Sequence, residues 1–240
     1  MSTAGTSPSS DPTDAAGAAA PAPAAAAPAA AHTSADRIVW IDCEMTGLDL
    51  EHDALVEVAA VVTDSELRVL GDGVDVVVAP PPAALEQMGD FVRTMHTTSG
   101  LLPALEHGVT LEEAQEQVLA YVRQWVPDAG KAPLAGNSVG TDKAFLDRDM
   151  PALVGHLHYR VVDVSSIKEL ARRWYPRVYF AAPAKNGGHR ALADILESID
   201  ELRYYRAALM PAAPGPDSAT ARRVAADVVA TSVKRGVLAP

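Results

Sequence analysis

RIVWIDCEMTGL, residues 37–48, is the stretch that decides the fold. Its β-branched and aromatic residues are typical of a buried strand, until Asp42 and Glu44 interrupt the pattern. Because side chains alternate along a strand, Asp42 and Glu44 point to one face, and Cys43 points to the other. Two buried carboxylates repel each other unless something positive lies between them. The alternative is a strand that ends in two solvated acids.

A second acidic position, Asp142, lies in a predicted helix. Asn137 or Ser138 is a suitable N-cap for this helix, which should end before Pro151. The apolar residues of the helix lie three or four positions from Asp142, which places its carboxylate on the inward face. Buried acids are uncommon unless they are paired, so Asp142 is a further candidate ligand.

The third segment carries His189 and Asp194. Apolar residues at helical spacing continue to residue 209, so Asp194 falls near the start of a long helix. A histidine has an ordinary pKa of about 6.5, which suits proton transfer near neutral pH. The alternative for His189 is a histidine at a helix start that bonds only to the backbone.

The rest of the chain alternates between strand and helix patterns, as expected of an α/β domain. Residues 55–63 and 68–78 are predicted to be strands that pair antiparallel with the first through short turns, and 133–136 is a further short strand. Capping boxes over residues 110–113 and 166–169 predict the starts of two helices.

The order and spacing of these segments resemble the oligoribonucleases, in the histidine-containing branch of the DEDD exonuclease superfamily. The resemblance spans about residues 37–211 and includes the runs at 40–42, 44–48, 136–138 and 168–174. It implies a ribonuclease H-like exonuclease fold, an α/β fold whose central mixed sheet is flanked by helices.

The resemblance also implies a chemistry. The carboxylates of Asp42, Glu44, Asp142 and Asp194 would bind two divalent cations, and His189 would be the general base. Oxygen ligands predominate in this set, which favours Mg²⁺ or Mn²⁺ over Zn²⁺. Two such cations about 4 Å apart can stabilise both the attacking and the leaving oxygen of a phosphodiester.

Substrate contacts follow from the resemblance as well. Leu48 would wedge against a base, and Phe91 would stack on a base where relatives carry tryptophan. Tyr159 would reach into the site of a neighbouring subunit, which implies a homodimer. The residues expected to cap a terminal phosphate are His96, Ser138, Arg160 and Ser165.

Composition limits the class of substrate. The 240 residues allow one domain of ordinary size plus tails, and the net charge is −11. Such a charge argues against a protein that grips long nucleic acid through many phosphates, but not against one that binds very short RNA. The single cysteine, Cys43, excludes an internal disulfide and a cysteine-based zinc site.

The two ends of the chain differ from the domain at 37–211. Residues 1–36 are mostly Ala, Pro, Ser and Thr and are expected to form a disordered tail. Residues 212–240 form a C-terminal tail with one short helix predicted over 220–235. Prolines interrupt the alanine-rich stretch and no basic segment precedes it, so we expect no signal peptide, no contact with a membrane, and a cytoplasmic protein.

Three functions fit these observations. The leading hypothesis is a 3′→5′ exoribonuclease that cuts dinucleotides and short oligoribonucleotides into 5′-mononucleotides, the final step of RNA degradation. The second is a broader exonuclease of the same superfamily that acts on the 3′ ends of DNA or of structured RNA. The third is a non-catalytic nucleotide-binding module, although binding alone gives no reason to gather four mutually repelling carboxylates.

Overall fold

The computed structural model describes residues 33–184 and 188–234. Most of the expected disordered tail, residues 1–32, lies outside the described residues, as does the last part of the predicted C-terminal helix. Residues 34–36, which we assigned to the tail, form a short 3-10 helix, and the buried hydroxyl of Ser34 donates to Asp128 Oδ2 at 3.0 Å. Ordered structure therefore begins before residue 37.

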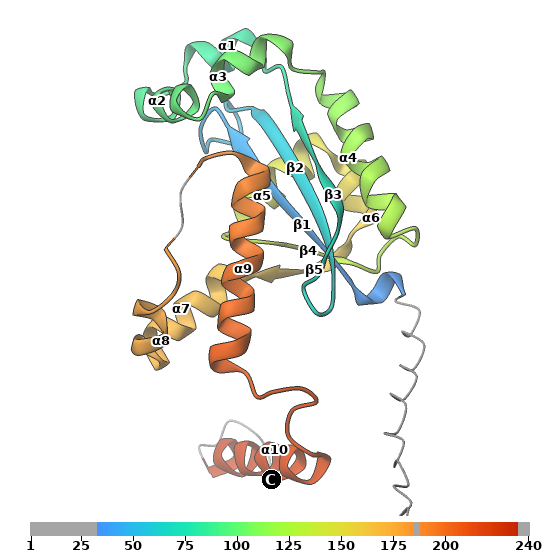
Figure 1. The fold of residues 1–240 in the computed structure, drawn as a ribbon, viewed down its shortest axis with the longest axis vertical. Helices are drawn as coiled ribbons and strands as arrows, with labels where there is room; N and C mark the ends of the chain where they lie inside the picture. The colour runs from blue at the N-terminus through green and yellow to red at the C-terminus, as the bar shows by residue number, and fades with distance from the viewer. Residues whose placement is uncertain (1–32, 185–187, 235–240) are drawn as a thin grey trace, which may run out of the picture. The chain divides into compact units, whose positions relative to one another are not determined.

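A five-stranded mixed sheet forms the centre of the domain, in the order β3-β2-β1-β4-β5 (Figure 1). Strand β1 (Arg37–Met45) is antiparallel to β2 (Leu55–Asp64), and β2 is antiparallel to β3 (Val69–Val77). Strand β4 (Pro133–Gly136) is parallel to both β1 and β5 (His158–Asp163). The predicted α/β class and the antiparallel pairing of the first three strands are confirmed.

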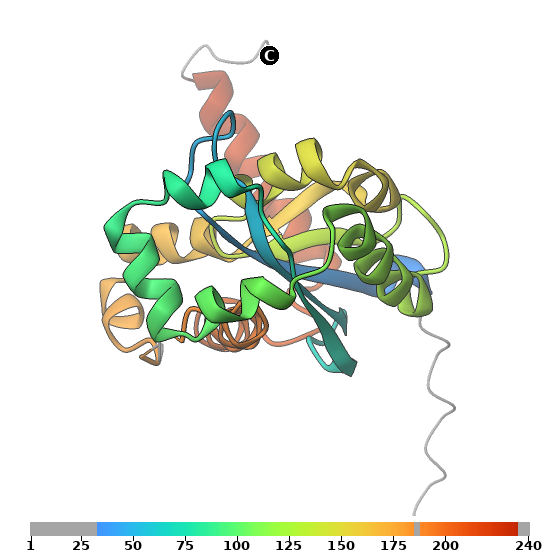
Figure 2. The same cartoon turned by 90° about the horizontal axis from the view of Figure 1, so that it is seen from above.

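Three short helices cover one end of the sheet, where β2 begins and β3 ends (Figures 1 and 2). They are α1 (Pro82–Glu86), α2 (Asp90–Thr98) and α3 (Leu101–Ala104), and a 3-10 turn at Leu105–His107 follows them. A small apolar cluster that includes Val56 packs α1, α3 and the 3-10 turn against the strands. The acidic residues of β1, Asp42 and Glu44, lie toward the same end of the sheet.

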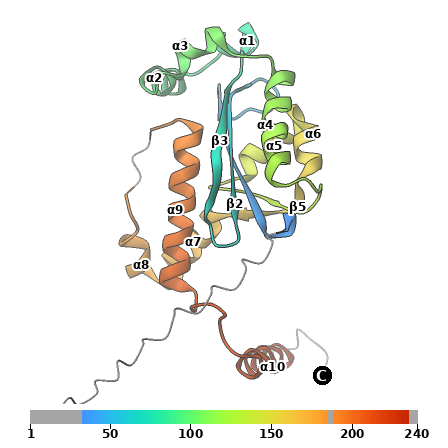
Figure 3. The same ribbon diagram turned by 45° about the vertical axis from the view of Figure 1, so that its right-hand side comes forward.

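Other helices cover the two faces of the sheet (Figure 3). One face packs against α4 (Leu111–Trp125), α5 (Gly140–Asp149) and α6 (Pro151–His156), and the other against α7 (Val164–Trp174) and α9 (Ala191–Leu209). Each face therefore has its own apolar core.

Strand β1 alternates between these two cores. Val39, Ile41 and Cys43 belong to the core under α4, α5 and α6, whereas Trp40 belongs to the core under α9. By the same alternation, Asp42 and Glu44 lie on the α9 face of the strand. Two further helices complete the described chain, α8 (Pro176–Phe180) and α10 (Ser218–Lys234).

The predicted helix starts are partly wrong. The capping box at Thr110 is present and opens α4. Helix α7, in contrast, begins two residues before the predicted box at Ser166, because Asp163 at the end of β5 accepts a hydrogen bond from Ser165 N at 3.1 Å and caps the helix. Because Asp163 already caps the helix, the predicted box at Ser166 does not mark its start.

Helix α5 also begins differently from the prediction. Neither Asn137 nor Ser138 caps it, and Val139 holds the N-cap position without a side-chain hydrogen bond. Ser138 is instead directed toward Asp163 and Ser165. Among the residues that the structure describes, no helix is both long and apolar enough to cross a membrane.

Candidate active site

Asp142 is fixed directly against β1. Strand β4 pairs with β1 only at Val39 and Trp40, so later backbone groups on that side of β1 can bond to side chains. The N–H of Cys43 donates to Asp142 Oδ1 at 3.1 Å. The carboxylate of Asp142 thus lies beside the part of the strand that carries Asp42 and Glu44.

Asp142 is only 7% exposed, as its inward position on the predicted helix required. Burial raises the pKa of its carboxyl group to about 6, although hydrogen bonds from its own backbone and from Cys43 act in the opposite direction. A carboxylate held in this way favours a nearby positive charge.

The structure brings Glu44, His189 and Asp194 together. Each offers one ligand atom, and these three atoms all lie within 4.8 Å of one another. Glu44 comes from β1, Asp194 from the first turn of α9, and His189 from the segment just before that helix. The pKa of Glu44 is raised to about 7, first by burial and then by nearby carboxylates, of which Asp194 acts most strongly.

This arrangement fits a divalent cation. The donor set consists of carboxylate oxygens and one imidazole nitrogen. Burial raises the pKa values of Glu44 and Asp142, and neighbouring carboxylates raise that of Glu44 further. Asp42 is half-buried on the same strand. Burial raises the pKa of the Cys43 thiol, and the charges of Asp142, Asp42 and Glu44 raise it further. Asp42 and Asp142 are not part of this close group of three ligand atoms.

Sequence reasoning missed Glu57 and Arg190. Glu57 is completely buried on β2, directly opposite Glu44 in the strand pairing. Its Oε1 accepts from Arg190 Nε at 2.7 Å, and its Oε2 accepts from the backbone N–H of Ala191 at 2.9 Å. The available signal was an acid inside an otherwise apolar strand, at a place where a carboxylate needs a partner.

Two of the four expected phosphate-capping residues lie together. The hydroxyl oxygens of Ser138 and Ser165 are 3.1 Å apart at the N-terminus of α7. The backbone N–H of Ser138 is also held, by Asp163 Oδ1 and Ser165 Oγ, both at 3.0 Å. Ser138 has a φ of 53°, a left-handed conformation that is uncommon for serine and that these bonds stabilise.

Arg160, the third expected capping residue, lies on β5 beside Tyr159. Both side chains are exposed, Tyr159 at 76%, and the Arg160 guanidinium carbon lies 5.3 Å from the centre of the tyrosine ring. Strand β5 is an edge of the sheet, and both side chains are open to solvent.

The fourth expected capping residue, His96, is placed differently. Its ring is completely buried, and its Nε2 is 2.9 Å from the carbonyl oxygen of Met45. Its Nδ1 lies 4.0 Å from Glu44 Oε2. His96 therefore lies beside a site carboxylate. Its contact with a terminal phosphate stays a prediction.

The residues expected to contact bases are exposed. Leu48 is 75% exposed and Phe91 is 80% exposed. A cavity of about 660 Å³ connects Phe91 with His189. The residues that line it are Asp90, Phe91, Thr94, Met95, Thr98, Ser99, Gly188 and His189.

Hydrogen bonds from two sides hold the loop that carries Leu48. Asp53 accepts from Thr46 Oγ1 at 2.8 Å and from Asp49 N at 2.9 Å, and a Cβ at Gly47 would lie 2.3 Å from the same carboxylate. A side chain at position 47 would therefore displace Asp53.

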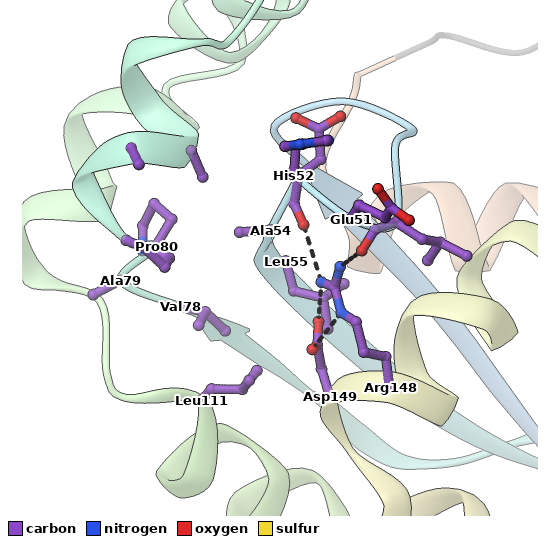
Figure 4. A pocket seen from close by; sticks show the side chains of 15 residues that line it. Glu51, His52, Ala54, Leu55, Val78, Ala79, Pro80, Leu111, Arg148 and Asp149 are labelled. Carbon is purple, nitrogen blue, oxygen red and sulfur yellow. Dashed lines mark hydrogen bonds and ion pairs between the residues drawn. The ribbon is translucent and has the colours of Figure 1, made fainter.

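Arg148, at the end of α5, braces the loop from the other side (Figure 4). It donates to the carbonyl oxygens of Leu50 and Asp53 and pairs with the neighbouring Asp149. These residues border a separate cavity of about 590 Å³ under α1, which none of the candidate ligands lines.

An exonuclease family model matches residues 39–202 of the chain. An oligoribonuclease from Streptomyces avermitilis is 70% identical over 191 residues, which cover 80% of this chain and 96% of that protein. The chain belongs to the oligoribonuclease family. Oligoribonucleases from Cutibacterium acnes (62% identity, 79% of this chain and 94% of that protein) and Mycobacterium avium (58%, 80% and 89%) are similar over the same extent.

Solved structures agree on the fold of this oligoribonuclease-family chain. Exonuclease I from Methylocaldum szegediense aligns with a TM-score of 0.53 at 18% identity, over 72% of this chain and 41% of that chain. A product-bound exonuclease I gives a TM-score of 0.54 at 14% identity, over 72% and 43%. The chain spans about two fifths of the length of these exonucleases. The expected ribonuclease H-like exonuclease fold is confirmed.

Proposed function

We propose that the chain is a metal-dependent 3′→5′ exoribonuclease that hydrolyses dinucleotides and short oligoribonucleotides to 5′-mononucleotides, the final step of RNA degradation. The observation that carries this proposal is the meeting of Glu44, His189 and Asp194 within 4.8 Å, in a chain that covers nearly the whole length of an oligoribonuclease at 70% identity.

Asp42, Glu44, Asp142 and Asp194 would hold two divalent cations, Mg²⁺ or Mn²⁺. When bound, these cations would offset the negative charge on the attacking and leaving oxygens of the phosphodiester. The chain supports such a role by keeping Glu44 and Asp142 in surroundings that raise their pKa values. Carboxylates in these positions lose their protons readily when positive charge arrives.

His189 is the proposed general base. Its side chain is exposed while Glu44 and Asp194 lie within 4.8 Å, so it can meet a water molecule at the mouth of the site. It would take a proton from that water as the oxygen attacks phosphorus. The bond between phosphorus and the O3′ of the preceding nucleotide breaks, and a 5′-mononucleotide is released.

The exposed residues beside the acids would select the substrate. Phe91 borders the cavity that reaches His189 and can stack on a base, and Leu48 can wedge against a second base. Ser138 and Ser165, whose hydroxyl oxygens lie together, would cap the terminal phosphate of a short RNA with Arg160. A cap of this kind favours substrates of two to a few nucleotides.

A homodimer and a cytoplasmic location are also part of the proposal. Tyr159 is 76% exposed on the edge strand β5, which is consistent with its reaching into a neighbouring subunit. An exposed edge strand is a common site for pairing with a second chain. Size-exclusion chromatography with light scattering would measure the oligomeric state.

The test is hydrolysis of 5′-labelled RNAs of two, three, five and twenty nucleotides with Mg²⁺ or Mn²⁺, using Asp194→Ala as the inactive control. Fast loss of the dinucleotide with slow attack on the 20-mer supports the proposal. Efficient trimming of the 20-mer that leaves the dinucleotide intact would indicate the broader exonuclease instead. No cleavage of any RNA would indicate a binding module.

A further inference from the structure

We propose that Glu57 and Arg190 are positioning residues that hold His189 in place beside Glu44 and Asp194. This inference rests on the proposed exonuclease function, because it concerns the geometry of its general base. Neither Glu57 nor Arg190 is among the ligands or the base of the proposed site.

The first observation is that the buried Glu57 has a partner for each of its carboxylate oxygens. Its carboxylate is 0% exposed, and both oxygens are used. Oε1 accepts from Arg190 Nε at 2.7 Å and forms an ion pair with Nη2 at 2.6 Å, while Oε2 accepts from Ala191 N at 2.9 Å. One carboxylate thus fixes both the side chain of Arg190 and the first backbone N–H of α9.

The second observation is the place of Arg190 in the chain. It directly follows His189, and its carbonyl oxygen accepts from Asp194 N at 3.1 Å in the first turn of α9. The backbone of Arg190 therefore connects the proposed base with the proposed ligand. A shift of Arg190 would move both side chains relative to Glu44.

The third observation is the register of β1 and β2. Glu57 is paired with Glu44 across the two antiparallel strands, so their side chains project from the same face of the sheet. The bond from Glu57 to Arg190 therefore ties His189 to the strand pair that carries Glu44. A neighbouring strand contributes too, because Asp75 Oδ2 lies 3.5 Å from Arg190 Nη2.

His189 itself needs such support. Its φ is 48°, in the left-handed region that non-glycine residues seldom occupy. Residues persist in this conformation when the surrounding structure determines it. The close approach of α9 to β3 adds to the constraint, since a Cβ at Gly73 would lie 3.0 Å from Leu192 Cδ1.

The chain offers a matched control on the same helix. Arg206 near the other end of α9 pairs with Glu66 at 2.6 Å, and Arg190 and Arg206 are both 36% exposed. The carboxylates differ, because Glu57 is 0% exposed and Glu66 is 52% exposed. An arginine lost from the exposed pair should change little, since such pairs contribute weakly.

The experiment compares Arg190→Ala, Arg190→Lys, Glu57→Gln and the control Arg206→Ala. Each protein is assayed well below its melting temperature for kcat and KM on a dinucleotide, and its Mn²⁺ affinity is measured by calorimetry. We expect Arg190→Ala to lower kcat by about tenfold or more, since small displacements of a reacting group are costly. KM and Mn²⁺ affinity should stay within about twofold, because the base acts only in the transition state.

Arg190→Lys keeps the charge but loses the two-pronged bond, so it should recover part of the lost kcat. If Arg190→Ala does not fold, Arg190→Lys and Glu57→Gln carry the test. Equal kcat for wild type and these variants would overturn the proposal. A loss of kcat with an equal loss of Mn²⁺ affinity would overturn it too, because that result indicates collapse of the metal site.

Amide hydrogen exchange of residues 188–194, measured without metal or substrate, gives a readout that does not depend on activity. We expect faster exchange in Arg190→Ala than in Arg206→Ala. Equal exchange in the two variants would overturn the positioning role. An inactive wild-type protein, in contrast, would count only against the proposed function.

Discussion

The site has two groups of residues that differ in how far the fold covers them. The acidic group is buried or partly buried, with Asp142 7% exposed, the Glu44 side chain 12% exposed, and Asp42 and Asp194 of intermediate exposure. The substrate group, Leu48, Phe91 and Tyr159, is 75% to 80% exposed. The fold therefore covers the charged group more than the predicted substrate group, which is open to solvent.

The largest expected effect on hydrolysis comes from removing a charge from the acidic group. Asp142→Asn should lower dinucleotide hydrolysis by about 10³-fold, because preorganised charge stabilisation is a dominant contribution to catalysis. The control is Asp147→Asn on the same helix, where Asp147 pairs with Lys143 at 2.7 Å on the exposed side. Initial rates at saturating Mn²⁺ measure both variants. Comparable rates for the two would contradict the assignment of Asp142.

The second prediction separates the base from the ligands. His189→Ala should slow hydrolysis by about 10²-fold, the usual contribution of a general base. Mn²⁺ binding should remain, because the carboxylates of Glu44 and Asp194 are still present. Single-turnover rates and calorimetry measure the two effects in one preparation. A variant that keeps its activity would show that another group accepts the proton.

The third prediction concerns the exposed group. Phe91→Ala should raise KM for a dinucleotide about tenfold with little change in kcat, since stacking contributes to binding rather than to the transition state. Phe91→Trp should lower KM through its larger ring. Steady-state kinetics provide both numbers. An effect of Phe91→Ala on kcat alone would place this residue with the catalytic group.

The smallest expected effect is a shift of stability with pH. The folded pKa of Glu44, about 7, lies above its ordinary value of 4.5, so the unfolded chain loses this proton at lower pH. Folding stability without metal should therefore fall as pH rises from about 4.5 to about 7. The pKa of Asp142, raised to about 6, acts in the same direction.

Bound metal ions should offset this loss of folding stability at higher pH. The rise in melting temperature caused by Mg²⁺ or Mn²⁺ should increase from pH 5 to pH 7.5, since the ions bind the deprotonated carboxylates. Differential scanning fluorimetry at several pH values measures it, with Asp142→Asn as the weakened control. A metal effect that is independent of pH would contradict the raised pKa values.

The positions of Asp42, Glu44 and Asp142 on their strand and helix could be predicted from the sequence because they follow from local rules. Alternation along a strand put Asp42 and Glu44 on one face, and spacing of three and four residues put Asp142 on the inner face of its helix. The antiparallel strands were likewise predicted, and they match β2 and β3 to within one residue at each end.

Contacts between distant segments could not be predicted in this way. Glu57 and Arg190 are 133 residues apart, and a single acid in an apolar strand does not indicate which arginine it binds. The burial of His96 depends on how α2 packs, and the start of α7 depends on Asp163, which closes β5 and caps the helix. Each of these features is decided by tertiary packing.

We propose that the acidic group holds the metal ions that hydrolysis requires. Mn²⁺ should be titrated into the metal-free protein while bound Mn²⁺, by electron paramagnetic resonance, and dinucleotide hydrolysis are followed in the same samples. We predict two ions per chain, activity that rises with their occupancy, and loss of both signals in Asp194→Ala. Full hydrolysis in excess chelator, or activity without bound Mn²⁺, would contradict the account.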